Sequence, residues 1–182
     1  MLKAYLMLPI VVIDDSKEDL LLAERVIRQA RLLNPVHLFR DAVHCHAYFS
    51  DASAETEPAL MFLDLVMFPR SGIEVVRSLK RHPRAAASLT VMLTGLGDVR
   101  LIQQGYDAGA TTFLIKPFSI SDFRNFLRAF GSYFTIKETA DGRTLQWSDT
   151  FLEHHKRVFE QAESRNGAAR ADANDVIPKP PQ

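Results

Sequence analysis

The chain has 182 residues, of which 47% are hydrophobic, and its 22 Lys and Arg side chains balance its 22 Asp and Glu side chains. This length suffices for one globular domain with an appendage, and the balanced charge excludes a global field that would attract nucleic acid or an anionic membrane surface. No apolar run approaches the roughly 18 residues of a membrane span. The single cysteine, Cys45, excludes an internal disulfide framework and fits a cytoplasmic location.

The N-terminal segment, MLKAYLMLPIVVIDD, ends in two aspartates, Asp14 and Asp15. A lysine followed by an apolar run superficially resembles a signal peptide, but a signal peptide ends at a small-residue cleavage site. We therefore interpret residues 9–13 as a buried strand. A helix is expected next, because Ser16 can act as its N-cap and apolar residues recur on one face as far as Ala30.

Five short apolar runs predict five strands, with helical patterns between them. The runs are PIVVI (9–13), VHLF (36–39), ALMFL (59–63), LTVML (89–93) and TTFLI (111–115). Alternating strands and helices indicate a parallel sheet covered by helices on both faces. The first, third and fourth runs are apolar nearly throughout, as expected for strands that are buried on both faces. We therefore predict a doubly wound α/β fold that ends near residue 131.

Serine or aspartate residues lie where each of the five helices should begin. Two of these starts, Ser16 with Asp19 and Ser71 with Glu74, resemble capping boxes. The candidate N-caps of the second, fourth and fifth helices are Asp41, Asp98 and Ser119.

The pattern changes after residue 131. Apolar residues alternate in FTIKETADGRTLQW (134–147) around an Asp-Gly pair, which predicts a β-hairpin. Ser148 can then cap an amphipathic helix, and from Asn166 onward Ala, Asn, Asp and Pro dominate, which is typical of a flexible tail. We expect a main domain at 8–132, a C-terminal extension at 133–165 that can act as a dimer arm, and a tail at 166–182.

Polar side chains gather at the carboxyl ends of the predicted strands, where a doubly wound sheet places its ligand crevice. Asp14 and Asp15 follow the first strand, Asp64 ends the third, Thr94 the fourth and Lys116 the fifth. Three carboxylates in one pocket repel each other unless a cation compensates them. A hard cation with oxygen ligands, most plausibly Mg²⁺, and the Lys116 ammonium would do so.

The expected metal ligands are Asp15 and Asp64 directly, Asp14 through water, and the backbone carbonyl of Val66. A carboxylate beside Mg²⁺ can attack a phosphoryl group and form an acyl phosphate, with positive charge stabilising the transferred group. The hydroxyl of Thr94 could bind a phosphoryl oxygen once that group is on Asp64, and this would draw its loop inward.

Residues 9–131 resemble the receiver domain of two-component response regulators. The resemblance rests on the Asp pair at 14–15, on Asp64, on Thr94 and on GATTFLIKP at 109–117. It implies a flavodoxin-like fold with strand order 2-1-3-4-5, a Mg²⁺ cofactor and a sensor histidine kinase as partner. It also implies that Asp64 is the phospho-acceptor, Lys116 the family's lysine, Thr94 the switch hydroxyl and Phe113 the switch aromatic.

The sequence departs from the family pattern after Asp64. The family usually has Pro four residues and Gly eight residues after the acceptor, whereas this chain has Phe68, Pro69 and Gly72. We therefore expect a reshaped loop with the site retained. Val66 and Leu96 are apolar and cannot orient a water molecule, so we expect slow self-hydrolysis of the acyl phosphate.

The C-terminal region has no basic face or recognition helix, so DNA binding is not expected. Ile120, Phe123, Leu127 and Phe130 should face the sheet, which would leave Phe126 and Tyr133 exposed as part of a homodimer interface. The alternative is that the C-terminal arm folds back and covers them. The segment IVVIDDSKEDLLLAERVI is similar to the small stand-alone regulators that partner phytochrome-linked histidine kinases, so a bacteriophytochrome is a candidate partner.

Two other functions remain open, although the resemblance implies a signalling protein and not a turnover enzyme. One is a haloacid-dehalogenase-like phosphatase, which also uses Asp, Thr or Ser, Lys and Mg²⁺ but places its nucleophile in a D-x-D motif after the first strand. The other is a phosphorylation-independent scaffold. His44, Cys45 and His46 resemble a metal cluster, but consecutive helical residues point to different sides, so we interpret them as ordinary helix residues.

Overall fold

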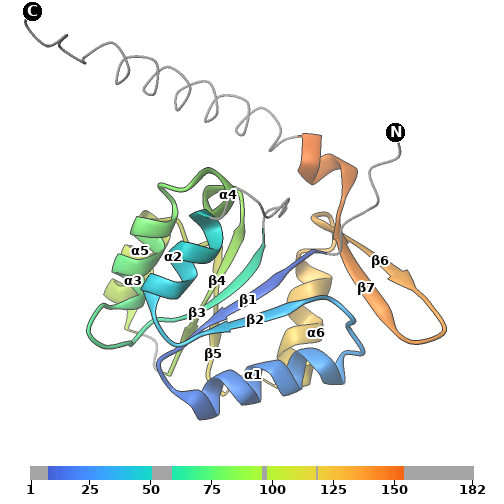
Figure 1. Ribbon diagram of the computed structural model, residues 1–182, viewed down its shortest axis with the longest axis horizontal. Helices are drawn as coiled ribbons and strands as arrows, with labels where there is room; N and C mark the ends of the chain where they lie inside the picture. The colour runs from blue at the N-terminus through green and yellow to red at the C-terminus, as the bar shows by residue number, and fades with distance from the viewer. Residues whose placement is uncertain (1–7, 51–58, 96–97, 118, 154–182) are drawn as a thin grey trace, which may run out of the picture.

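Five parallel strands form the central sheet, in the order β2-β1-β3-β4-β5. The computed structural model describes residues 8–50, 59–95, 98–117 and 119–153 (Figure 1). The strands are β1 (Ile10–Ile13), β2 (Val36–Phe39), β3 (Leu60–Asp64), β4 (Leu89–Thr94) and β5 (Thr112–Ile115). The predicted fold class and strand order are confirmed. Every strand lies within about one residue of its expected bounds, because the apolar runs that predict the strands are the buried part of the sheet.

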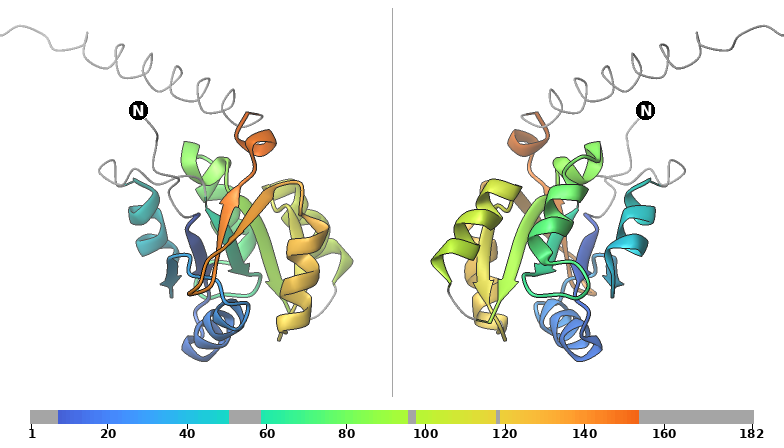
Figure 2. Two further views of the ribbon diagram at one scale, coloured as in Figure 1. Left: turned by 90° about the vertical axis from the view of Figure 1, so that its right-hand side faces the viewer. Right: turned by 90° about the vertical axis from the view of Figure 1, so that its left-hand side faces the viewer.

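Helices cover both faces of this sheet (Figures 1 and 2). One apolar cluster joins the sheet to α1 (Lys17–Gln29) and α6 (Ile120–Ala129). The other cluster joins the sheet to α2 (Ala42–Ser50), α3 (Gly72–Leu79) and α5 (Val99–Ala108). A short helix that the sequence did not predict, α4 (Pro83–Ala86), precedes β4. Within the described residues, no helix has the length and apolar character needed to cross a membrane.

The burial of the strands follows their position in the sheet. Every residue of β1, β3 and β4 is buried, whereas β2 and β5, at the two edges, are mostly half-buried. Along β1 the side chains alternate between faces, so that Ile10 and Val12 join the cluster with α1 and α6, and Val11 and Ile13 join the other. The carboxyl ends of β1, β3 and β4 are therefore held by strands that are buried along their whole length.

The helices begin at the predicted residues, but one helix start has a different hydrogen-bond pattern from the one predicted. Ser71 and Glu74 form the predicted capping box, and Ser119 with Asp122 forms a second one. At the start of α1, Ser16 Oγ accepts a hydrogen bond from the Asp19 N–H, but the Asp19 carboxylate contacts Lys116 instead of returning to Ser16. The capping box predicted there is therefore wrong.

The predicted hairpin is present as β6 (Phe134–Glu138) and β7 (Arg143–Trp147), which pair antiparallel. Phe134, Leu145 and Trp147 are buried in the same cluster as α1 and α6. Residues 149–153 are helical, and Ser148 Oγ accepts the Phe151 N–H, as expected of an N-cap. The remainder of the predicted helix and the tail, residues 154–182, lie outside the described residues.

The prediction that Phe126 is exposed is wrong. Only 4% of its surface is accessible, and its ring lies 5.9 Å from that of Phe62 and 6.3 Å from that of Phe134. The hairpin covers the side of α6 that the sheet does not reach, so the buried face of α6 is wider than the sequence suggested. Tyr133 is exposed, as predicted. The structure thus supports the alternative that the start of the arm folds back over Phe126.

Candidate functional site

Three carboxylates converge at the carboxyl ends of the central strands. Asp14 and Asp15 directly follow β1, and Asp64 is the last residue of β3, which is paired with β1. Each of the three offers an oxygen, and these oxygens all lie within 4.8 Å of one another. Adjacent parallel strands end side by side, so the arrangement follows directly from the strand order. This group of residues is called the acidic site below.

The two aspartates after β1 differ in burial and in hydrogen bonding. Asp14 is buried, with Oδ1 accepting the Ser16 N–H at 2.9 Å and Oδ2 accepting from Lys116 Nζ at 2.6 Å. Asp15 is half-buried, and its Oδ2 accepts the Phe68 N–H at 2.9 Å. Both oxygens of Asp14 are thus engaged by the protein itself, whereas Asp15 lies at the open side of the site.

Lys116, the residue after β5, brings its ammonium into the acidic site. Its Nζ lies 2.6 Å from Asp14 Oδ2, 2.8 Å from Asp19 Oδ2 and 3.0 Å from Asp64 Oδ1. Burial lowers the pKa of this amine, but the hydrogen bonds from the carboxylates outweigh burial, so the pKa of Lys116 is raised. The ammonium is therefore charged at any physiological pH.

The sequence pattern does not predict Asp19 as a site residue, because it places the Asp19 carboxylate in a capping box with Ser16. It lies four residues after Asp15 at the first turn of α1, which begins at the same edge of the sheet. A side chain in the first turn of a helix lies close to the strand end that precedes the helix. The position of Asp19 in this first turn is therefore the sequence signal that could have placed it at the acidic site.

Asp64 is buried, and its surroundings disfavour the ionised form of its carboxyl despite the nearby Lys116 ammonium. Burial raises the pKa of Asp64, and the nearby Asp14 raises it further, against hydrogen bonds from Lys116 and the Val66 N–H that lower it. A hard divalent cation with oxygen ligands would remove the repulsion between Asp14, Asp15 and Asp64. The donor set therefore fits Mg²⁺, the ion predicted from the sequence.

Two further predicted residues lie on the neighbouring strands. Thr94 is buried at the end of β4, and its carbonyl accepts the Lys116 N–H at 2.8 Å. Phe113 on β5 is half-buried and turns toward α5. Its ring lies 5.0 Å from that of Tyr106 and directly against Gly105, where an added Cβ would come within 2.5 Å of the ring. The Phe113 side chain therefore points inward.

The loop between β3 and α3 is held by one hydrogen bond from its middle to the acidic site and by another that joins its two ends. The Phe68 N–H donates to Asp15, while the Phe68 side chain is 85% exposed. Where the loop meets α3, the Gly72 N–H donates to the Leu65 carbonyl at 2.9 Å, and a Cβ at position 72 would collide with the Asp64 carbonyl oxygen. Only glycine fits at position 72, so the retained register of Gly72 relative to Asp64 has a steric cause.

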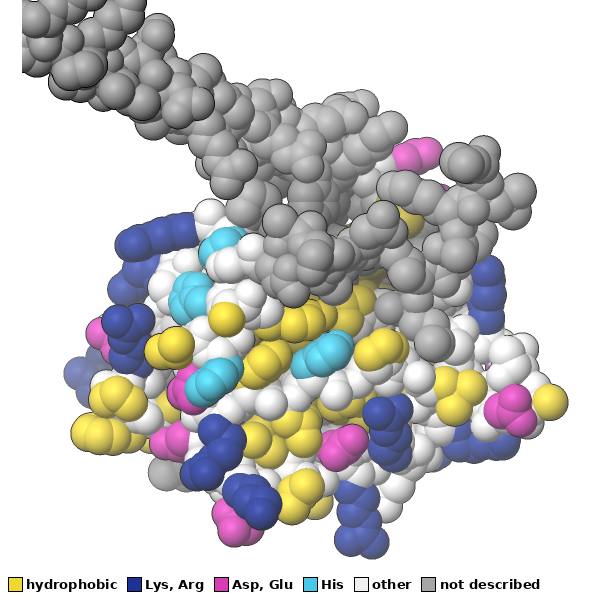
Figure 3. Space-filling view, viewed as in Figure 1, with side chains coloured by type: hydrophobic (Ala, Val, Ile, Leu, Met, Phe, Trp, Pro, Cys, Tyr) yellow, Lys and Arg dark blue, Asp and Glu magenta, His cyan; other side chains and the backbone are white. Residues whose placement is uncertain are grey.

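The side chains of the candidate cluster on α2 contact different parts of the protein. His44 Nδ1 lies 2.8 Å from Asp41, whereas His46 Nε2 lies 2.9 Å from Ser78 Oγ on α3. Cys45 is buried, and burial raises the pKa of its thiol to about 12. Figure 3 shows histidine side chains scattered over the face that carries α2. These residues diverge, as consecutive helical positions must.

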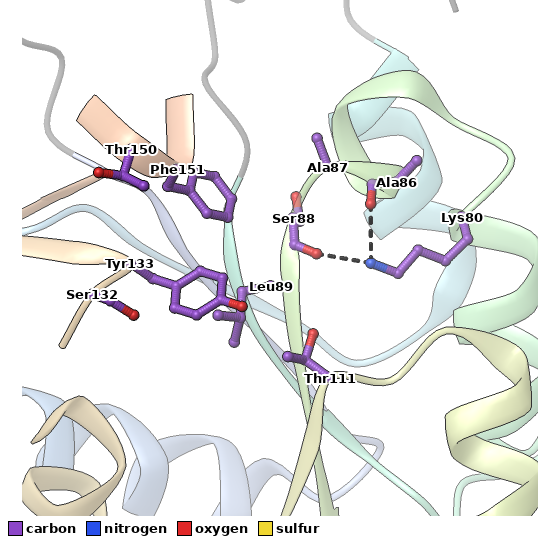
Figure 4. A pocket seen from close by; sticks show the side chains of 10 residues that line it. All are labelled: Lys80, Ala86, Ala87, Ser88, Leu89, Thr111, Ser132, Tyr133, Thr150 and Phe151. Carbon is purple, nitrogen blue, oxygen red and sulfur yellow. Dashed lines mark hydrogen bonds between the residues drawn. The ribbon is translucent and has the colours of Figure 1, made fainter. Parts of the chain in front are cut away.

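A cavity of about 530 Å³ lies at the opposite, amino-terminal edge of the sheet (Figure 4). It is lined in part by Leu89, Tyr133, Phe151 and Lys80. The Lys80 amine donates to the carbonyls of residues 85, 86 and 88, and burial lowers its pKa to about 8. This lysine satisfies carbonyl groups around α4, and the cavity holds none of the predicted site residues.

Comparison with known proteins finds a family model described as "Response regulator receiver domain", which matches residues 10–128. Among curated proteins, a 77-residue segment is 35% identical to the DNA-binding dual master transcriptional regulator RpaA of Synechocystis. That match covers 42% of this chain and 32% of RpaA. The chain spans less than half the length of the curated relatives that it matches.

Two solved structures of bacteriophytochrome response regulators share this fold. AtBRR is 23% identical with a TM-score of 0.62, and the match covers 73% of this chain and 99% of AtBRR. RtBRR is 21% identical with a TM-score of 0.62, and the match covers 88% of this chain and 96% of RtBRR. The second match includes more of this chain than the family model does, so the shared fold extends beyond residue 128.

Proposed function

We propose that this chain, which belongs to the response regulator receiver domain family of two-component signalling, accepts a phosphoryl group on Asp64 from a sensor histidine kinase. In the proposed reaction, a carboxylate oxygen of Asp64 attacks the phosphorus of a phosphohistidine. The bond from phosphorus to the imidazole nitrogen breaks, its electron pair stays on the imidazole, and an acyl phosphate forms.

The observation that carries this proposal is the contact of Asp64 with the Lys116 ammonium beside two further carboxylates. We assign Mg²⁺ to Asp15 and Asp64 directly, to Asp14 through water, and to the Val66 carbonyl. The engagement of both Asp14 oxygens by Ser16 and Lys116 supports an indirect role for Asp14. When bound, Mg²⁺ supplies positive charge that neutralises the carboxylates and the phosphoryl oxygens.

The chain's own residues hold the phosphoryl group after transfer. Lys116 donates a hydrogen bond to one phosphoryl oxygen, and the Thr94 hydroxyl donates to another. Because Thr94 and Lys116 are joined by a backbone hydrogen bond, movement of Thr94 toward the phosphoryl group also moves the start of the segment after β5. Phe113 already points inward and is held there only by packing. We assign this inward position to the switch aromatic in the state that follows the movement of Thr94.

We further propose that the conformational signal is read by a second copy of this chain. Apolar side chains are exposed along α5 and β5, among them Val99, Tyr106 and Ile115, and Tyr133 is exposed after α6. This surface supports a homodimer through α5, β5, α6 and the arm. Phe126 does not take part, because it is buried. The division into a receiver at 8–132, an arm at 133–165 and a tail at 166–182 is part of the same proposal.

The proposed partner is a bacteriophytochrome-linked histidine kinase in the cytoplasm. The support for this kinase is the likeness in fold to AtBRR and RtBRR. The support for the cytoplasm is that the sequence has a single cysteine and so no internal disulfide, as is usual for proteins of a reducing compartment. Slow self-hydrolysis of the acyl phosphate is proposed because Val66 presents an apolar side chain at the surface beside Asp64 and cannot orient a water molecule. Leu96, the other apolar residue in this argument, lies outside the described residues.

Phosphotransfer profiling tests this function. The protein is mixed with a panel of purified, labelled histidine kinases at short times, with Asp64→Asn as the control. We expect rapid label transfer from one kinase to the wild-type chain and none to Asp64→Asn. Transfer from no kinase, or equal transfer to both proteins, would overturn the proposal.

The phosphatase alternative makes a different demand on the site. It requires a nucleophile directly after β1, where Asp14 has both oxygens occupied by hydrogen bonds. Turnover of a chromogenic phosphate ester that is abolished by Asp14→Asn would favour it. The scaffold alternative would be favoured if Asp64 stays unmodified in the presence of Mg²⁺ and acetyl phosphate.

A further inference from the structure

The Lys116 ammonium contacts a third carboxylate, that of Asp19, which has no part in the proposed metal site or in phosphoryl transfer. An ammonium has three N–H donors, and the three carboxylates lie at hydrogen-bonding distance from Nζ. We propose that Asp19 is a positioning residue. Together with Asp14 it anchors two of the three hydrogens, so that the remaining one points at Asp64. This inference rests on the proposed phosphorylation of Asp64.

The local structure frees the Asp19 carboxylate for this contact. In a capping box the N3 carboxylate would accept the N–H of the N-cap residue, here Ser16. That N–H already donates to Asp14 Oδ1 at 2.9 Å. Asp19 keeps the other half of the cap, since its N–H donates to Ser16 Oγ at 3.2 Å. Its carboxylate then lies 2.8 Å from Lys116 Nζ.

Asp19 forms the solvent-side anchor of the ammonium. The side chains of Asp14 and Asp64 are 2% and 8% exposed, whereas that of Asp19 is 43% exposed. A recess of about 330 Å³ adjoins Asp19 and Lys116 and is lined by Leu22, Ala23, Leu93 and Pro117. Without the Asp19 carboxylate, the Lys116 N–H that donates to it would donate to water instead. The Lys116 side chain would then be free to turn into this recess.

The two anchors matter because they do not change during the reaction. When Asp64 becomes an acyl phosphate, the Lys116 N–H that donated to Asp64 donates to a phosphoryl oxygen instead. Asp14 and Asp19 keep their hydrogen bonds, so the ammonium stays in place and exchanges one partner only. A charged group that is already oriented at the reacting atom contributes through positioning.

The test compares Asp19→Asn with Glu18→Gln. Glu18 is a matched control, since it lies in the same turn, its substitution removes the same charge, and its carboxylate contacts Ser16 Oγ instead of Lys116. The rate of Asp64 phosphorylation by acetyl phosphate is measured by intact-protein mass spectrometry over a range of Mg²⁺ concentrations. We expect Asp19→Asn to lower the maximal rate by about tenfold and leave the half-saturating Mg²⁺ concentration unchanged, because Asp19 is not a ligand. Glu18→Gln should stay within about twofold of wild type.

A second readout needs neither Mg²⁺ nor phosphate. In ¹H–¹⁵N spectra of the lysine ammonium groups, Lys116 should give a slowly exchanging signal that is identified by its loss in Lys116→Arg. Asp19→Asn should broaden or remove this signal, and Glu18→Gln should retain it. If wild type is phosphorylated and Asp19→Asn equals Glu18→Gln in both measurements, the role of Asp19 is overturned. If wild type itself is never phosphorylated, the proposed function fails first and the inference falls with it.

Discussion

The side-chain amide of Asn34 hydrogen-bonds both backbone groups of Leu145, as a neighbouring strand would. Its Nδ2 donates to the Leu145 carbonyl at 2.7 Å, and its Oδ1 accepts the Leu145 N–H at 2.8 Å. The same Nδ2 donates to the Leu8 carbonyl at 2.8 Å, and Asn34 is fully buried. One side chain thus joins the hairpin to the start of the central sheet.

Asn34→Ala should loosen the hairpin and destabilise the protein by about 2–3 kcal/mol, because buried carbonyl and N–H groups lose their partners. The single tryptophan, Trp147, reports on this contact, since it is buried between Phe134 and Phe151. Urea unfolding followed by Trp147 fluorescence measures the change. Asn125→Ala, at an exposed position of α6, is the control and should leave stability unchanged.

Gly72→Ala should disturb the acidic site directly. The new Cβ would collide with the Asp64 carbonyl oxygen, so β3 or the loop after it must shift. We expect a loss of stability of about 2 kcal/mol or more, and weaker Mg²⁺ binding in a calorimetric titration. Gly95→Ala is the matched control at the end of β4, where a Cβ meets nothing within 4 Å. Equal behaviour of the two variants would contradict the steric role of Gly72.

Gly105→Ala should force the Phe113 ring away from α5. The added Cβ would lie 2.5 Å from the ring, and overpacking of this kind typically costs about 1–3 kcal/mol. The double variant with Phe113→Leu should recover most of the loss, because the smaller side chain leaves room for the methyl group. Thermal unfolding of the two single variants and the double variant measures the coupling. If the stability losses of the two single variants add up in the double variant, the side chains at positions 105 and 113 do not clash.

Lys80 should make stability depend on pH in the alkaline range. Burial lowers its pKa from 10.5 in the unfolded chain to about 8 in the folded protein. Between these values the unfolded chain binds a proton that the folded chain lacks, so the free energy of unfolding rises with pH, by up to about 1.4 kcal/mol per unit. The stability that the folded protein gains at high pH, where Lys80 is neutral, is lost as the pH falls through about 8. Lys80→Met should remove the slope in urea unfolding measured across this range.

The sheet and the acidic site were predictable from the sequence for the same reason. Strands buried on both faces appear as continuous apolar runs, and parallel strands end at one edge, so the residues after each run must meet. Asp14, Asp15, Asp64 and Lys116 do meet there. Their roles in phosphoryl transfer remain predictions.

The features that the sequence did not predict depend on long-range contacts. Asn34 is separated from Leu145 by 111 positions, and nothing local marks it as buried. The burial of Phe126 depends on the hairpin, which the helical period of α6 does not reveal. Asp19 has two partners available, and the choice between Ser16 and Lys116 is decided only by the hydrogen bond from Ser16 to Asp14.

The most direct test of the central claim is to locate the phosphoryl group. The protein is incubated with acetyl phosphate and Mg²⁺, the acyl phosphate is trapped by borohydride reduction, and the modified residue is identified by peptide mass spectrometry. We predict modification at position 64 alone, dependent on Mg²⁺ and absent in Asp64→Asn. No modification, or modification of Asp14 or Asp15 in place of Asp64, would contradict the account.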